Sequence, residues 1–147
     1  IGRMIAGNAG ILVTRVVYVK RGEGRTFVVV DAGMNDLIRP TLYDAYHDIR
    51  PVAEPPPNAR PLTVDVVGPV CESGDYLARD RALPPLTEGD LLAVMTAGAY
   101  GAVQSGTYNT RRLVPEVMVN GADYAVVRPR PSYDDLIGLD ALPAWLV

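Results

Sequence analysis

Alternating apolar and polar residues run along much of the chain, and this pattern predicts strands rather than long helices. Residues 11–20 (ILVTRVVYVK) and 26–33 (TFVVVDAG) are rich in valine, a residue favoured in strands. The stretch 21–25 (RGEGR) between them contains two glycines and predicts a turn. Together the three segments predict a β-hairpin.

Four more strands are predicted further along the chain, at residues 62–70, 90–101, 116–121 and 123–130. The last two are joined by Asn120-Gly121, a strong turn sequence, and so predict a second hairpin. The strand at 90–101 is expected to end in small residues followed by Tyr100.

Helical spacing is confined to short segments. Residues 34–46 have it, but Pro40 interrupts them, so we expect a short, irregular helix. Ser132 is a suitable N-cap for a helical turn at 132–139. Residues 50–61 contain five prolines and are expected to form a surface loop with no regular element.

Six strands, few helices and no alternation of strands with helices predict a mainly β fold, an antiparallel β-barrel or sandwich with one or two short helices. At 147 residues the chain is long enough for one such domain with its own core. Folds of this kind host many activities, so function has to be argued from individual residues.

Composition limits the classes of binding partner and the cellular compartment that can be expected for this protein. A net charge of −3 gives no reason to expect nucleic acid or an anionic membrane as a partner, and no apolar run approaches the roughly 20 residues that span a bilayer. A single cysteine forms no internal disulfide, which fits a reducing cytoplasm, and with one histidine it is too little for a structural zinc site. The chain begins at Ile1 without an initiator Met, so we expect it to be part of a longer protein.

Cys71, the only cysteine, lies between the turn sequences Gly68-Pro69 and Gly74-Asp75. A lone cysteine is more often a small buried hydrophobe than a catalyst, but turn residues on both sides indicate an exposed connection where functional groups gather. The thiol could be a core residue, a metal ligand, a nucleophile or a proton donor. A nucleophile lacks an evident base, because His47, the only histidine, lies in another segment and is interpreted as structural. A protonated thiol can serve as a general acid.

Three other groups could bind a ligand. Arg39 and Tyr43 are four residues apart, which places them on one side of a helical turn. A guanidinium and a phenol together suit a carboxylate, although a solvated arginine beside a half-buried tyrosine is an equally good interpretation. Small residues before Tyr100 allow backbone amides to approach a ligand closely. Gly2-Arg3 could offer an amide and a cation to a phosphate or carboxylate.

Read in order, these stretches resemble the C-terminal part of the diaminopimelate decarboxylase family, over almost the whole chain. The resemblance rests on the motifs GR, FVVVDAGMNDLIRPTLYDAYHDI, VGPVCESGD, GDLLAVMTAGAYG and YNTR. CESGD, IRPTLY and AGAYG in this order are specific, whereas any one of them alone is not.

The resemblance implies that residues 1–147 are the C-terminal β-domain of a fold-type III decarboxylase, similar to alanine racemase and ornithine decarboxylase. An N-terminal (β/α)8 barrel, absent from this chain, would carry pyridoxal 5′-phosphate on a lysine. The implied reaction converts meso-2,6-diaminopimelate into L-lysine and CO2 in lysine biosynthesis, in a cytoplasmic homodimer with shared active sites. Lys20, the only lysine, ends a strand beside a glycine turn and cannot replace the barrel lysine, so this chain alone is expected to be inactive.

The resemblance also assigns roles to individual residues. Cys71 matches the proton donor, and Glu72 matches the neighbour that recognises the distal ammonium of the substrate; both are implied to reach into the partner subunit's site. The remaining matches are Gly2 at the cofactor phosphate, Arg3 at phosphate and substrate, Arg39 and Tyr43 at the substrate, and Tyr100 at cofactor and substrate. The family's phosphate motif is Glu-Pro-Gly-Arg, and this chain departs from it by beginning Ile1-Gly2-Arg3.

Two alternatives remain open. One is a related decarboxylase acting on ornithine, arginine or carboxynorspermidine, against which the CESGD sequence is the distinguishing feature. The other is a non-catalytic β-domain that only dimerises or binds a ligand.

Overall fold

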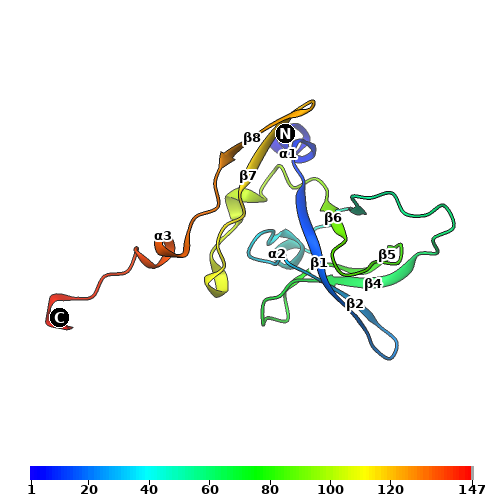
Figure 1. Ribbon diagram of the computed structural model, residues 1–147, viewed down its shortest axis with the longest axis horizontal. Coiled ribbons are helices and arrows are strands. Elements are labelled where there is room, and N and C mark those ends of the chain that lie inside the picture. The colour runs from blue at the N-terminus through cyan, green and yellow to red at the C-terminus, as the bar shows by residue number, and fades with distance from the viewer. Residues whose placement is uncertain (147) are drawn as a thin grey trace. The chain divides into compact units, whose positions relative to one another are not determined.

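The computed structural model describes residues 1–146 and divides the chain into two compact units, the first covering Ile1–Ser105 and the second beginning at Gly106. Figure 1 shows the order of the elements along the chain. No helix among the described residues has the length and apolar character needed to cross a membrane.

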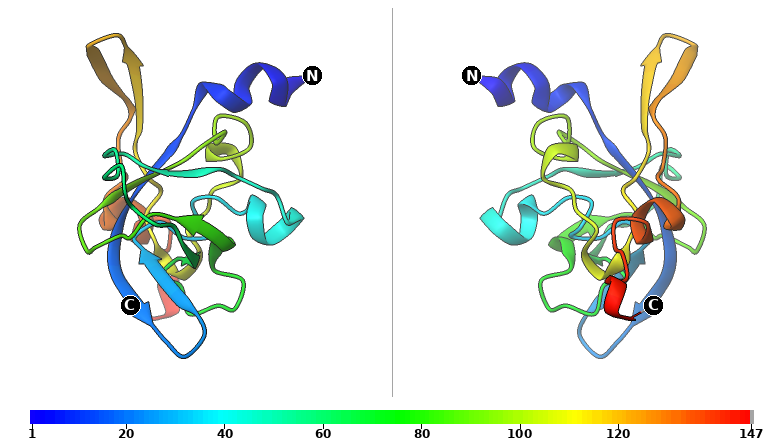
Figure 2. Two further views of the ribbon diagram at one scale, coloured as in Figure 1. Left: turned by 90° about the vertical axis from the view of Figure 1, so that its right-hand side faces the viewer. Right: turned by 90° about the vertical axis from the view of Figure 1, so that its left-hand side faces the viewer.

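The first unit is built on one six-stranded sheet. Its strands are β1 (Leu12–Arg21), β2 (Thr26–Val30), β3 (Ile49–Pro51), β4 (Leu62–Val67), β5 (Tyr76–Leu83) and β6 (Leu91–Val94), arranged in the order β3-β6-β1-β2-β4-β5. The sheet curls into a nearly closed, barrel-like shape, across which the long β1–β2 hairpin runs in blue in Figure 2. This architecture confirms the predicted mainly β, barrel-like fold.

The core lies inside this curled sheet, and along β1 and β2 inward-pointing residues alternate with outward-pointing ones. Val28 and Val30 of β2 are buried, whereas the alternate residues Phe27 and Val29 lie on the outer face. The largest fully buried side chains are Leu37, Leu77, Leu92, Val16, Val28, Val30, Val66, Val94 and Thr14. Burying a valine or leucine completely contributes about 1.5–3 kcal/mol, so these residues supply much of the folding free energy.

Several local predictions are confirmed. The first hairpin forms with Val19 opposite Val28 and with Gly24 at φ +82° in its turn. The predicted irregular helix is α2 (Arg39–Tyr43), which has Pro40 in its first turn. It is short because Asp44 adopts a left-handed conformation and ends it.

Other predictions need correction. The strand predicted at 90–101 ends at Val94, and residues 95–101 form a series of turns instead. The loop predicted at 50–61 begins inside β3, an edge strand, where a proline is tolerated because no neighbour needs its missing N–H. Strand β5 was not predicted. The run of charged residues Arg79, Asp80 and Arg81 interrupts the alternation of apolar and polar residues that would have predicted a strand. The pairing of β5 with β4 also contains register shifts.

Two further differences concern the whole sheet. β2 and β4 pair in parallel, whereas all the other pairings in this sheet are antiparallel. The chain reaches this arrangement by crossing over through α2 and β3, a connection that local sequence does not reveal. The described residues also contain three short α-helices instead of one or two, because the chain begins with α1 (Gly2–Ala6), followed by the 3-10 turn η1 (Gly7–Ala9).

The second unit is small. It contains the hairpin of β7 (Glu116–Asn120) and β8 (Asp123–Arg128) with Gly121 at φ +61°, as predicted from Asn120-Gly121. Helix α3 (Tyr133–Ile137) starts at the predicted cap, since Ser132 and Asp135 form a capping box. Within residues 1–146 the other 3-10 turns are η2 (Ala102–Gln104), η3 (Tyr108–Thr110) and η4 (Ala144–Leu146).

Candidate functional site

Three of the sequence-predicted residues meet in the first unit. The guanidinium carbon of Arg39 lies 5.7 Å from the ring centroid of Tyr43 and 5.6 Å from that of Tyr100, distances within the range of a cation–π contact. Arg39 is partly buried, whereas Tyr43 is 58% and Tyr100 47% exposed. A guanidinium in cation–π contact with rings can still bind a carboxylate through its N–H groups, so this cluster can hold an anionic ligand.

The segment 95–101 brings Tyr100 to Arg39. Its backbone turns sharply, since Thr96 and Tyr100 have left-handed φ angles of 61° and 64°. Two hydrogen bonds fix it to the start of the chain: the amide of Ala97 donates to Gly10 O (2.9 Å) and that of Gly98 to Gly7 O (3.1 Å). A Cβ on Gly98 would overlap the Ala6 carbonyl oxygen, so only glycine fits there.

Cys71 and Glu72 lie on the loop 68–75, between β4 and β5. Both side chains are exposed, which excludes the core-thiol interpretation of Cys71. The Glu72 carboxylate accepts the amide of Gly74 within the loop (3.3 Å). Among the described residues, no group of three or more His, Cys, Asp or Glu side chains is arranged to hold a metal ion. The interpretation of Cys71 as a metal ligand therefore has no support from neighbouring ligands in this part of the chain.

Asp75 shapes this loop, a role that the sequence analysis did not assign. Its buried carboxylate accepts the amides of Met34 (2.6 Å) and Val70 (2.5 Å). Its backbone oxygen accepts the amide of Gly68 (3.0 Å). One side chain thus closes the loop and connects it to the segment before α2. The available signal was an acid directly after the glycine of CESGD, a position where side chains commonly bond to nearby amides.

The loop also packs against α2. The Thr41 hydroxyl donates to the carbonyl of Gly74, and the Tyr76 hydroxyl donates to that of Pro40 (3.4 Å). Since Arg39 begins the same helix, the loop with Cys71 and the cluster around Arg39 are built on one element.

Gly2 and Arg3 lie on α1, and both residues are exposed. Nothing lies within 4 Å of a Cβ built on Gly2, so a ligand could approach the backbone there. Helix α1 leads directly into the residues that hold segment 95–101. Within residues 1–146, no hydrogen bond or ring contact joins Arg3 to the Arg39 cluster. The structure therefore does not bring these two arginines into contact.

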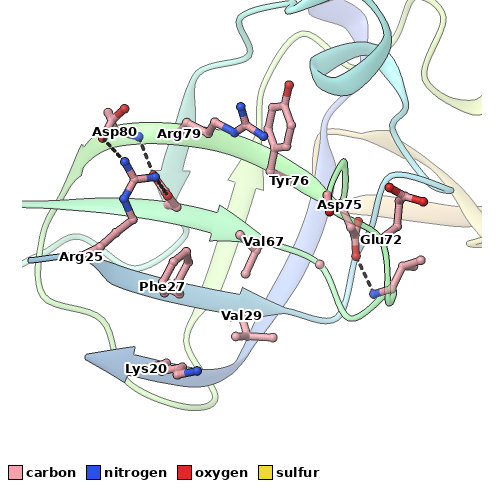
Figure 3. A pocket seen from close by; sticks show the side chains of 14 residues that line it. Lys20, Arg25, Phe27, Val29, Val67, Glu72, Asp75, Tyr76, Arg79 and Asp80 are labelled. Carbon is pink, nitrogen blue, oxygen red and sulfur yellow. Dashed lines mark hydrogen bonds and ion pairs between the residues drawn. The ribbon is translucent and has the colours of Figure 1, made fainter. Parts of the chain in front are cut away.

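Lys20 lies elsewhere, on the outer face of the sheet. It lines a shallow groove of about 590 Å³ with Phe27, Val29 and Val67, shown in Figure 3. The groove is bordered by charged side chains, of which Arg25 pairs with the buried Asp65 (2.7 Å). Lys20 is thus surrounded by a different set of residues from that around Arg39.

His47 is buried, in keeping with its interpretation as a structural residue. It is 3% exposed, and its Nδ1 lies 2.9 Å from the carbonyl oxygen of Met95. Burial lowers the pKa of its imidazole below the usual 6.5. The bond to Met95 joins two segments that sequence reasoning had treated separately.

Comparison with known proteins places the first unit in a family. Residues 4–98 match the family described as pyridoxal-dependent decarboxylase, C-terminal sheet domain. Diaminopimelate decarboxylase of Zymomonas mobilis is 48% identical over 145 residues, 99% of this chain and 34% of that protein. The enzyme of the same name from Archaeoglobus fulgidus is 52% identical over 147 residues, again 99% of this chain and 34% of that protein.

A solved structure agrees with these matches. The crystal structure of diaminopimelate decarboxylase from M. jannaschii in complex with L-lysine has a TM-score of 0.92 at 36% identity, covering 99% of this chain and 33% of that one. The chain spans about a third of the length of the curated relatives it matches. The match over residues 4–98 shows that the chain belongs to the pyridoxal-dependent decarboxylases, within the family of their C-terminal sheet domains.

Proposed function

We propose that residues 1–147 form the C-terminal β-domain of a decarboxylase that converts meso-2,6-diaminopimelate into L-lysine and CO2. The observation that carries the proposal is the cluster of Arg39 with the rings of Tyr43 and Tyr100, with the exposed Cys71 on a loop packed against the same helix. Identity of about half to relatives named for this activity favours diaminopimelate over the substrates of other decarboxylases. In this proposal a (β/α)8 barrel forms the remaining two thirds of the protein.

The residues present fit part of a pyridoxal phosphate site. Gly2 has an open backbone and Arg3 an exposed cation, which suit a phosphate, while the Tyr100 phenol is available to both cofactor and substrate. The covalent attachment has to come from the barrel, because Lys20 lies on the outer face of the sheet. When bound, the cofactor withdraws electrons from the substrate carbon that loses CO2.

This chain would position the substrate by charge. The Arg39 guanidinium binds a substrate carboxylate through its N–H fork, assisted by the Tyr43 hydroxyl. Glu72, whose carboxylate is exposed, binds the distal ammonium of diaminopimelate. Arg39 of one subunit and Glu72 of the other subunit would together select a substrate that is charged at both ends.

Cys71 would complete the reaction. The carbon–carboxylate bond breaks, CO2 leaves, and the Sγ–H proton moves to the carbon that carried the carboxylate. The thiolate then recovers a proton from water. Because Cys71 and Glu72 project from an exposed loop, we propose that they act in the partner subunit's site of a cytoplasmic homodimer.

Mixed dimers of the full-length protein test this proposal. One subunit carries Cys71→Ala and the other lacks the barrel lysine, so that each parent dimer is nearly inactive. If sites are shared, one site of the mixed dimer has both defects and the other has neither. We therefore expect about half the activity of a wild-type dimer to return, against a loss of about 10²–10⁴-fold for the Cys71→Ala parent.

The control is Ser73→Ala, an exposed neighbour in the same loop, which is expected to keep wild-type activity. Mixed dimers that form but recover nothing would contradict the sharing of sites. A full-length protein that binds the cofactor but prefers ornithine or arginine would show that a related decarboxylase is the correct assignment, and one with no activity would favour a binding domain.

A further inference from the structure

The short segment that holds His47 is attached to the end of strand β6. The imidazole Nδ1 lies 2.9 Å from Met95 O, and because a carbonyl only accepts, Nδ1 carries the hydrogen and donates. In the opposite direction, the amide of Met95 donates to Asp48 O at 2.8 Å. Two hydrogen bonds therefore fix Met95, the first residue of the segment that ends near Tyr100.

The second ring nitrogen indicates that this imidazole is neutral. Nε2 is buried and has no hydrogen-bond partner among the described residues. A proton on Nε2 would create a buried donor without an acceptor, which is costly. Burial lowers the pKa of His47, the bond to Met95 O opposes this, and the positive charges of Arg39 and Arg81 lower the pKa further.

His47 lies among the elements of the candidate site. Arg39 of α2 and Arg81 of β5 are the charged groups that act on it, and Met95, directly after β6, contributes its carbonyl. Arg81 donates to His47 O (3.0 Å) and stacks over Tyr46 at 3.9 Å. A neutral ring adds no positive charge next to Arg39, so it does not repel that guanidinium.

We propose that His47 is a positioning residue of the candidate site: its neutral imidazole anchors Met95 through the Nδ1–H bond and thereby keeps Tyr100 against Arg39. The consequence for substrate binding rests on the proposed function, whereas the geometry can be tested on the 147-residue chain alone. The anchor at Met95 acts together with the bonds of Ala97 and Gly98 further along the segment.

Three substitutions of His47 distinguish the effect of its hydrogen bond from the effect of its side-chain size. His47→Asn keeps an N–H near the place of Nδ1, because both nitrogens are bonded to Cγ. His47→Gln moves the amide one bond further, to the region of Nε2, and is the matched control. His47→Leu removes both nitrogens at a similar size.

Fluorine NMR on chains labelled with 3-fluorotyrosine supplies the readout. A Tyr100→Phe variant identifies the Tyr100 resonance among those of the eight tyrosines. We expect His47→Asn to keep the wild-type Tyr100 shift, and His47→Gln and His47→Leu to move it toward the value of the unfolded chain. If His47→Leu does not fold, the Asn–Gln pair decides. A Tyr100 resonance that is unchanged in His47→Gln, or displaced equally in His47→Asn, overturns the inference.

Nitrogen-15 NMR checks the tautomer directly, because the chain contains one histidine. A neutral ring with the hydrogen on Nδ1 is expected, and a ring with the hydrogen on Nε2 would overturn the inference.

Kinetics of the full-length decarboxylase then test the consequence. A displaced Arg39–Tyr100 pair weakens binding in both ground and transition states, so His47→Leu should raise KM about tenfold with kcat within about twofold. His47→Asn should stay within about twofold of wild type in both. A fall in kcat with unchanged KM would contradict positioning. An inactive wild-type protein would defeat the proposed function but leave the NMR result valid.

Discussion

Two connections of the first unit carry proposed site residues, Cys71 and Glu72 on one and Tyr100 on the other, and they are held in different ways. The loop 68–75 is closed by a side chain, since the Asp75 carboxylate accepts two backbone amides. The segment 95–101 is held mostly through its backbone, which Gly98 brings against the first residues of the chain. Both connections follow the end of a strand. A side-chain acceptor stabilises loop 68–75, whereas close backbone packing stabilises segment 95–101.

The difference determines how each connection responds to mutation. Substituting asparagine for Asp75 replaces one carboxylate oxygen with an NH2 group, so the stabilisation of the loop can be reduced without being abolished. A backbone contact at Gly98 leaves no space for any larger residue, so a single methyl group displaces the whole segment. Segment 95–101 should therefore be the more sensitive of the two.

The largest effect is expected for Gly98→Ala in the 147-residue chain. The added Cβ would lie 2.7 Å from the Gly10 nitrogen and overlap the Ala6 carbonyl oxygen, so the backbone has to move. We expect the free energy of unfolding to fall by about 3 kcal/mol, at the upper end for overpacking. Urea unfolding measures this. Gly2→Ala, which meets nothing within 4 Å, is the control and should change stability by less than about 0.5 kcal/mol. Equal stabilities for the two variants would remove the contrast between the connections.

A smaller effect is expected for Asp75→Asn. The asparagine side chain offers one oxygen and one NH2 group, so one of the amides of Met34 and Val70 loses its acceptor. The cost should be about 1–3 kcal/mol in urea unfolding, with faster hydrogen exchange at the amide that is left unpaired. Asp44→Asn is the matched control, because Asp44 is exposed and asparagine suits its left-handed backbone. Should Asp75→Asn resemble this control, the carboxylate does not shape the loop.

The smallest effect is expected on the pH dependence of the free energy of unfolding, to which the titration of His47 contributes. Its pKa is lowered in the folded chain, so at pH below about 6.5 the unfolded chain takes up a proton that the folded chain does not. Stability is therefore complete above pH 6.5 and falls as pH decreases toward the folded pKa, by at most about 1.4 kcal/mol per pH unit for one proton. Comparing wild type with His47→Gln at pH 7.5 and 5.5 isolates this contribution, since the carboxylates are common to both. Parallel losses in the two proteins would show that His47 titrates normally.

Local patterns predicted a large part of the fold and some of the site. Alternating valines and glycine turns identified the β1–β2 hairpin, and Asn120-Gly121 identified the second one. The spacing of Arg39 and Tyr43 placed them on one side of a short helix, where both are found. The turn residues around Cys71 indicated its exposure. Each of these depends on residues a few positions apart, which is the range over which backbone geometry and turn preferences act.

The sequence by itself therefore determined the strands with regular alternation, the turns, the short helix and the exposure of the thiol loop. Only the tertiary structure decided the parallel pairing of β2 with β4, the edge strand β3, the contact of Arg39 with Tyr100, and the acceptors of Met34 and His47. The bonds of Asp75 and His47 span 41 and 48 positions. The physical reason is that a hydrogen bond or a ring contact depends on distance in space, and residues so far apart in sequence meet only after the sheet has curled around its core.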